Sequence, residues 1–162
     1  MKIVIADTGA LISLGLVDSI NLIEKVFGDF FITEAVWNEL NTYKNPKFTK
    51  ENYKRLETKV VKIQSSNRLA MIMDYGESES VILYEELNAD FLLIDDNKAR
   101  FIAESMGVNC IGSLGLLIEA KSKGLISHLK PIFEVWLNNE RHFSIKLLNT
   151  VLSKVGESLI EK

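Results

Sequence analysis

Short apolar runs without polar alternation recur along the chain, at residues 3–5, 30–32 and 91–94. A run of this kind is typical of a strand buried on both faces, as in the centre of a parallel sheet. Residues 108–111 indicate another short strand, and residues 59–63, which carry two lysines, indicate a strand near the sheet edge. The pattern therefore predicts five strands.

Segments with helical spacing of apolar residues separate these runs. Directly after the first run, Thr8 and Gly9 turn the chain into an apolar helical segment. Capping residues and glycines mark several other helix ends. Further helices are predicted after a cap at Asp18 or Ser19 up to Gly28, after Thr33, at 65–75, 77–87 and 97–106, and after Ser113. Strands that alternate with helices predict an α/β fold.

The last part of the chain is predicted to be helical, with two apolar faces. The first face comprises Leu129, Ile132, Phe133, Trp136 and Leu137, and the second comprises Leu148, Val151, Leu152 and Val155. We expect one domain over residues 1–162, with a core at about 1–125 and a helical extension at about 126–162. The two faces either pack on each other and on the sheet or leave apolar surface for a second copy, which predicts a homodimer.

Composition narrows the class of protein. Hydrophobic residues make up 47% and charged residues 25%, which is typical of a globular chain. No apolar run reaches the ~18 residues of a membrane span, and the residues after Met1 do not resemble a signal peptide. A single cysteine, Cys110, excludes an intrachain disulfide and a multi-cysteine zinc site. We therefore expect a cytoplasmic protein.

A net charge of −3 means that nucleic-acid binding would need a local basic patch. Residues 43–62 offer one, because lysines and an arginine are interleaved there with Tyr43, Phe48 and Tyr53. Such a mixture suits a phosphate backbone and stacked bases. The alternative is a solvated helix whose acidic members offset part of the charge. The candidate RNA-binding residues are Lys44, Lys47, Lys54 and Arg55.

Carboxylates follow the predicted strands or begin the predicted helices. They are Asp7, Glu39, Glu77 or Glu79, and Asp95 or Asp96. In a parallel sheet with right-handed crossovers these positions face one side, where open α/β sheets bind ligands. Carboxylates gathered without a basic residue repel one another unless they are protonated or a divalent cation neutralises them. Oxygen ligands alone favour Mg²⁺ or Mn²⁺, and such a site suits phosphodiester hydrolysis.

Each carboxylate also has a purely structural interpretation. Glu39 could be a solvated charge at the rim of its helix. Glu77 or Glu79 could complement a helix dipole. Asp96 or Asn97 could cap the helix that follows. These explanations cover single residues, but they do not explain why acids recur at every strand end.

Five motifs occur in a characteristic order: IADTGALI at residues 5–12, VWNEL at 36–40, GESESV at 76–81, LIDDNKAR at 93–100 and GSLGLL at 112–117. In this order and spacing the chain resembles the PIN-domain nucleases. Within them it resembles a PIN-like prokaryotic group related to the toxin ribonucleases of type II toxin–antitoxin systems. The resemblance covers roughly the first three quarters of the chain.

The resemblance implies a three-layer α/β/α fold whose five-stranded parallel sheet has the order 3-2-1-4-5, with extra C-terminal helices. It implies Mg²⁺- or Mn²⁺-dependent cleavage of single-stranded RNA, a homodimer and an antitoxin partner. The implied metal ligands are Asp7, Asp96 and Glu79, and Glu39 would ligate or orient a metal-bound water. The implied surrounding residues are Glu77, Asp95, Thr8 and Asn97. Ile94 and Gly9 stand where many members carry a hydroxyl residue.

Two other functions compete with the nuclease. A PIN-like module could bind RNA or a protein partner without cutting. A receiver-like phosphoryl-transfer domain would use a strand-end aspartate, but it would need an acid pair after the first strand and a lysine after the last one. The chain has neither, and it lacks a glycine-rich phosphate loop.

Overall fold

The computed structural model describes residues 1–161, which form two compact units: unit 1 is residues 1–116, and unit 2 is the described chain from residue 117 onward. Each unit is described by itself. The boundary between them falls inside helix α7 (Ser113–Ser122). The single domain with a core to about residue 125 stays a prediction.

Unit 1 is built on a five-stranded sheet whose order is β3-β2-β1-β4-β5. Every neighbouring pair of strands is parallel, and Ile5 in the central strand pairs with Phe31 on one side and Leu92 on the other. The strands are β1 (Lys2–Ala6), β2 (Gly28–Thr33), β3 (Val60–Val61), β4 (Phe91–Leu93) and β5 (Cys110–Ile111). The predicted fold class, strand order and edge position of β3 are confirmed.

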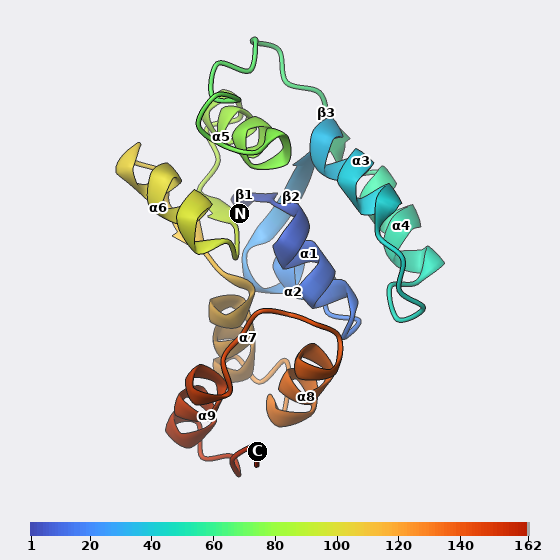
Figure 1. The fold of residues 1–162 in the computed structure, drawn as a ribbon, viewed down its shortest axis with the longest axis vertical. Coiled ribbons are helices and arrows are strands. Elements are labelled where there is room, and N and C mark those ends of the chain that lie inside the picture. Colours follow the sequence, from blue (N-terminus) through green and yellow to red (C-terminus); the bar gives the residue numbers. More distant parts are fainter. Residues whose placement is uncertain (162) are drawn as a thin grey trace. The chain divides into compact units, whose positions relative to one another are not determined.

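Helices flank this sheet and complete the α/β/α arrangement. In the view of Figure 1 the strands run between α5 and α6 on one side and α3 and α4 on the other. The helices of unit 1 are α1 (Thr8–Gly15), α2 (Asn21–Val26), α3 (Glu34–Thr42), α4 (Lys50–Glu57), α5 (Tyr75–Glu86) and α6 (Asn97–Ser105), followed by the start of α7. Hydroxyl and carboxyl side chains fix several starts: Thr33 Oγ1 accepts a hydrogen bond from the Val36 amide, and Asp96 Oδ1 accepts one from the Ala99 amide.

The core of unit 1 lies against the central strands. Val4, Ile5 and Ala6 are fully buried, as expected for an apolar run with sheet neighbours on both edges and helices on both faces. Burial of these side chains fixes the register of β1. It therefore also fixes where the chain leaves the sheet, which is at Asp7.

Two helix predictions differ from the structure. The helix predicted after a cap at Asp18 or Ser19 begins at Asn21 with Ile20 at the cap position, and Asp18 instead adopts a left-handed φ of 52°. The helix predicted at residues 65–75 is wrong, since this segment consists of turns. Asn67 explains this difference: its side chain accepts from the Leu69 amide and donates to Ser78 Oγ, which competes with helical hydrogen bonding.

Unit 2 contains the remainder of α7, α8 (Lys130–Asn138) and α9 (Ile145–Lys154). Trp136 is fully buried and stacks between Phe133 and Phe143, with ring centroids 5.6 Å and 4.5 Å away. Glu157 receives hydrogen bonds from the Leu129 and Lys130 amides and from Lys121 Nζ. Among residues 1–161, no helix is long and apolar enough to cross a membrane.

Candidate functional site

Asp7 lies where β1 ends and α1 begins, at the carboxyl edge of the sheet. Its amide donates to the Leu93 carbonyl at 2.9 Å, which ties this corner to the end of β4. The residue is only 6% exposed, although its carboxylate does not cap α1 in the described structure. A buried carboxylate that no helix end requires is costly unless it has another use.

The surroundings of Asp7 favour its protonated form. Burial, together with the nearby charges of Glu77 and Glu39, raises its pKa to about 8, although hydrogen bonds from the Thr8 amide and Ser80 lower it in part. The Ser80 hydroxyl lies 3.3 Å from Asp7 Oδ1 and 2.9 Å from the Gly76 carbonyl, so it donates to one of the two. Without a cation, Asp7 is therefore mostly neutral at pH 7.

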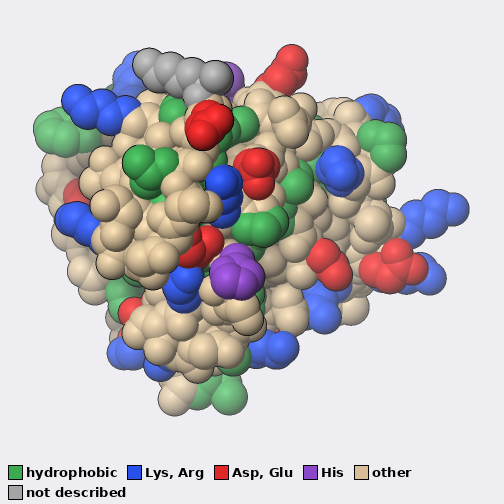
Figure 2. Space-filling view, turned by 90° about the horizontal axis from the view of Figure 1, so that it is seen from below, with side chains coloured by type: hydrophobic (Ala, Val, Ile, Leu, Met, Phe, Trp, Pro, Cys, Tyr) green, Lys and Arg blue, Asp and Glu red, His purple; other side chains and the backbone are tan. Residues whose placement is uncertain are grey.

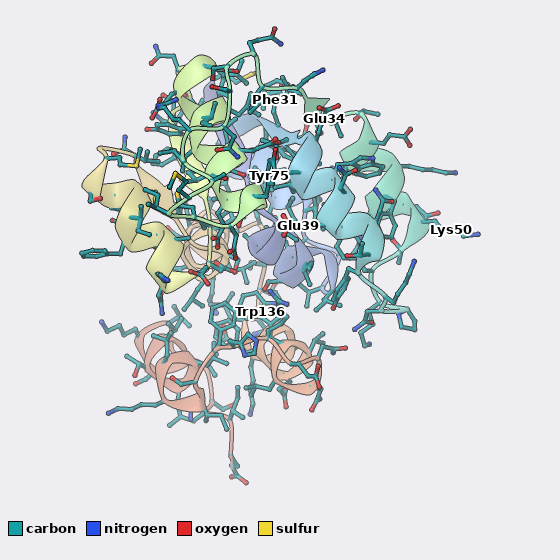
Figure 3. The ribbon with its side chains drawn as sticks, turned by 45° about the horizontal axis from the view of Figure 1, so that its top comes forward. Phe31, Glu34, Glu39, Lys50, Tyr75 and Trp136 are labelled. Carbon is teal, nitrogen blue, oxygen red and sulfur yellow. The ribbon has the colours of Figure 1, made fainter. Side chains whose placement is uncertain are left out.

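Glu39 projects from α3 toward the start of α5. Figure 3 shows it close to Tyr75, the first residue of α5, whereas Lys50 points away at the outer side of α4. Thr8 Oγ1 donates to Glu39 Oε1 at 3.0 Å, and a Cβ atom placed on Gly76 would come within 1.8 Å of that same oxygen. Burial raises the pKa of Glu39 and Asp74 adds to the increase, against the Thr8 hydrogen bond. Gly76 thus makes room for this carboxylate.

Glu77 and Glu79 point to different neighbours. Burial and the charges of Asp96, Asp74 and Glu39 raise the pKa of Glu77 to about 7, although the Asp74 amide lowers it in part. Glu79 Oε1 instead accepts from the Ala35 amide at 3.2 Å, at the start of α3. The structure therefore brings Glu77 together with Asp7, Glu39 and Asp96, and it places Glu79 at a helix N-terminus.

The two adjacent aspartates after β4 also differ. Asp95 accepts from the amide and the hydroxyl of Ser113, at 2.7 and 2.6 Å, so it holds the start of α7. Asp96 is exposed and uses one oxygen to cap α6, while its charge acts on Glu77. Asn97 is the exposed first residue of α6. Asp96 is thus the member of the pair that shares a site with Glu77.

A cavity of about 350 Å³ opens beside Glu77 and Asp96. Asp74 and Lys98 contribute further charges to its wall. The rest of the lining comes from Ala70, Met71, Ile72, Met73, Ala99 and Ile102. An acidic edge with a pocket next to it is the arrangement expected of a ligand site in an open α/β sheet.

We refer to Asp7, Glu39, Glu77 and Asp96 as the acidic site, and its composition suits a hard divalent cation. All donors are carboxylate oxygens, and burial together with neighbouring carboxylates raises the pKa values of Asp7 and Glu77, an effect that a bound cation would oppose. Within residues 1–161, however, no three acidic, histidine or cysteine side chains stand close enough to enclose a metal as they are placed. The donors fit the ion in chemistry, and they lie within electrostatic range of one another.

The basic residues of the stretch 43–62 have other neighbours than the residues of the acidic site. Lys44, Lys47 and Lys54 are exposed, whereas Arg55 pairs with Glu24 at 3.2 Å. Lys44 lines a second cavity of about 450 Å³ together with Tyr43, Phe48 and Tyr53. On the face shown in Figure 2, basic and acidic side chains are interspersed. Lys44 and Lys47 thus lie in the loop after α3, whereas Lys54 and Arg55 belong to α4.

Two members of the site went unrecognised in the sequence. Gly76 gives Glu39 its space, and Ser80 places a buried hydroxyl near Asp7. Both belong to the GESESV motif at residues 76–81, on either side of its two glutamates. Small residues that flank the acids were the available signal, because close approach of a helix to a neighbouring side chain requires them.

Comparison with known proteins bears on this arrangement. No curated protein matches the chain. The family DUF3368, described as a PIN domain, matches residues 3–157. That match spans nearly the whole chain and includes every residue of the acidic site. The five-stranded parallel sheet with its acidic carboxyl edge and the family match lead to one conclusion: the chain belongs to the PIN-domain family.

Proposed function

We propose that the protein is a Mg²⁺- or Mn²⁺-dependent endoribonuclease that cleaves single-stranded RNA. The observation that carries the proposal is the acidic site at the carboxyl edge of a PIN-domain sheet, where carboxylates from four separate segments gather and the pKa values of Asp7, Glu39 and Glu77 are raised. Mutually repelling carboxylates without a basic partner are stable as anions only when a cation joins them. Phosphodiester hydrolysis is the chemistry that such a site supports best.

In this proposal Asp7, Glu77 and Asp96 hold the cation. Glu77 replaces Glu79 in this role because Glu77 interacts with Asp7 and Asp96, whereas Glu79 binds the Ala35 amide. Asp7 must release its proton when the cation binds, which couples metal affinity to pH. Asp95 acts indirectly, since its bonds to Ser113 fix the chain beside Asp96.

A bound cation supplies charge neutralisation on the phosphate and lowers the pKa of water. Glu39 then has the task of orienting and deprotonating the attacking water. The Thr8 hydroxyl occupies Glu39 Oε1, which leaves Oε2 to accept the proton. Burial raises the pKa of Glu39 and so makes it a better base than a solvated glutamate.

The test is cleavage of a labelled single-stranded RNA by the purified protein in Mg²⁺, Mn²⁺ or EDTA. We expect cleavage with either metal, none in EDTA, and a loss of several powers of ten in Asp7→Asn and Asp96→Asn. Asp18→Asn is the matched control, because Asp18 is exposed and has a left-handed backbone that asparagine also adopts. Cleavage by Asp96→Asn at the parent rate would refute the assignment.

A second function has one observation in its favour. As placed, the carboxylates of residues 1–161 do not enclose a metal ion. A PIN-domain module that binds RNA or a protein without cutting would need no such enclosure. Retained RNA binding with no cleavage in either metal would select this alternative.

Biological context follows from the group that the sequence resembles. We propose that the protein is cytoplasmic, acts as the toxin of a toxin–antitoxin pair and forms a homodimer. Exposed apolar side chains, such as Leu147 and Leu159, provide contact surface, whereas Trp136 is buried and does not. Co-expression with the product of a small neighbouring reading frame would test the pair through relief of growth arrest.

A further inference from the structure

The cavity beside the acidic site is lined by side chains of two chemical kinds. They are the carboxylates of Glu77 and Asp96 and a set of apolar side chains that includes Met71, Ile72 and Ile102, here called the apolar wall. Its volume of about 350 Å³ is in the range of small-molecule pockets. A ligand that fills it can therefore place an anionic part near a cation held by the acids and an apolar part against the apolar wall.

Lys98 provides a positive charge at this cavity. It lies two residues after Asp96, in the first turn of α6, and it is exposed. In the described part of the chain its ammonium forms no hydrogen bond or ion pair. Although three carboxylates line the same cavity, none of them neutralises Lys98 directly, so the ammonium is available to an anion from outside.

The apolar wall is unusually open to water. Met71 is 95% exposed and Ile72 is 57% exposed, both in the turns that precede α5. Exposed apolar side chains gathered at a pocket indicate a binding surface. A thioether makes favourable contacts with flat aromatic rings, and an unpaired nucleobase is such a ring.

We propose that this cavity receives one unpaired nucleotide of the RNA substrate, with its phosphate at Lys98 and its base against Met71 and Ile72. The inference rests on the proposed function, and it deepens it by assigning the residues that select single-stranded RNA. A base in a duplex is stacked and paired, so it cannot enter the cavity. Phosphate contacts set affinity, and the apolar wall accepts any base face.

The test is binding of a short fluorescent single-stranded RNA, measured by anisotropy in Ca²⁺ at several salt concentrations. Lys98→Gln should weaken binding about two- to fivefold and reduce the slope of log K against log salt by about 0.7. Met71→Gln should weaken binding and leave the slope unchanged. Duplex RNA of the same sequence should bind more weakly than the single strand.

Matched controls make the same chemical changes elsewhere. Lys25→Gln removes an exposed lysine from α2. This helix leads into the start of β2 and so lies near the amino-terminal ends of the strands, away from the acidic site at their carboxyl ends. Met106→Gln changes an exposed methionine at the far end of α6. Both controls should bind RNA like the parent.

The outcomes separate the two proposals. If Asp96→Asn abolishes cleavage while Lys98→Gln and Met71→Gln bind like their controls, the nuclease stands and the nucleotide pocket is refuted. If both pocket variants weaken binding but no metal supports cleavage, the pocket stands and the nuclease is refuted. Absence of any RNA binding refutes both.

Discussion

Replacement of Asp7 by asparagine should change how stability depends on pH in the metal-free protein. Folding raises the pKa of Asp7 from 3.8 to about 8. The native state therefore retains a proton that the unfolded chain releases. Its contribution to stability is fully present below pH 3.8 and is lost as the pH rises toward 8. Asparagine has nearly the shape of the protonated acid and does not titrate, so Asp7→Asn lacks this loss.

The magnitude follows from proton linkage. The interval from pH 5 to pH 7 begins about one pH unit above the unfolded pKa of 3.8 and ends about one unit below the folded pKa of about 8. Within it, Asp7 holds about one proton more in the native state than in the unfolded state. One retained proton lowers the free energy of unfolding by about 1.4 kcal/mol per pH unit, or about 3 kcal/mol across this interval. Glu77, whose pKa rises to about 7, adds a decline of the same sign in both proteins.

Urea denaturation in EDTA at pH 5, 6 and 7 measures this effect. The free energy of unfolding of the parent should fall more steeply than that of Asp7→Asn, so the difference between them grows with pH in favour of the variant. Asp18→Asn should follow the parent. If the free energies of unfolding of the parent and Asp7→Asn change in parallel from pH 5 to pH 7, Asp7 ionises normally in the folded protein. That result would refute the argument that burial and neighbouring carboxylates raise its pKa.

Four further results are expected. Mn²⁺ at a hundredfold excess over its Kd should stabilise the parent by about 2.7 kcal/mol, seen as a higher melting temperature, and Asp7→Asn should lose this gain; a parent indifferent to Mn²⁺ speaks against a metal site. Gly76→Ala should displace the Glu39 carboxylate and reduce cleavage about a hundredfold. The melting temperature should stay the same, because only the end of the Glu39 side chain must move. Unchanged cleavage would show that Glu39 does not act in the reaction. Glu157→Gln should destabilise unit 2 by about 1.5–3 kcal/mol at neutral pH in urea denaturation. Although burial opposes ionisation, hydrogen bonds from Lys121 and two amides lower the pKa of Glu157, so its contribution is lost as the pH falls, and a variant as stable as the parent would contradict this. Light scattering should give twice the monomer mass of 18.3 kDa, and a mass near 18.3 kDa would exclude the homodimer.

The sheet could be predicted because its strands are buried on both faces. Such strands must be apolar throughout, and this leaves runs like residues 3–5 that a solvated helix does not show. Once the strands are predicted to be parallel with right-handed crossovers, every carboxyl end of a strand is expected at one edge. Asp7 and one of the pair Asp95 and Asp96 could therefore be predicted at this edge without knowledge of a single contact, whereas the choice of Asp96 came from the family resemblance.

The choice between Glu77 and Glu79 could not be made in the same way. Two residues apart on a helix, their side chains differ by about 200° in direction, so one faces the site and the other does not. Which one does depends on the rotation of α5 about its axis, and that is set by packing of buried residues such as Ser80 and Ile82. Local sequence does not encode this rotation. The same limit applies to the turns at residues 65–74, where Asn67 bonds to Ser78 in α5.

Glu157 has a consequence for how the chain tolerates changes at its C-terminus. Its carboxylate, with a side chain only 8% exposed, occupies the amides at the start of α8 and the ammonium of Lys121. A chain truncated at Gly156 loses all three bonds at once, so the first turn of α8 should fray and become sensitive to proteases. A tag fused after residue 162 leaves this anchor in place. A truncation that keeps these contacts must therefore retain Glu157, and it must also retain Ile160, whose backbone exchanges two hydrogen bonds with the Asn149 side chain.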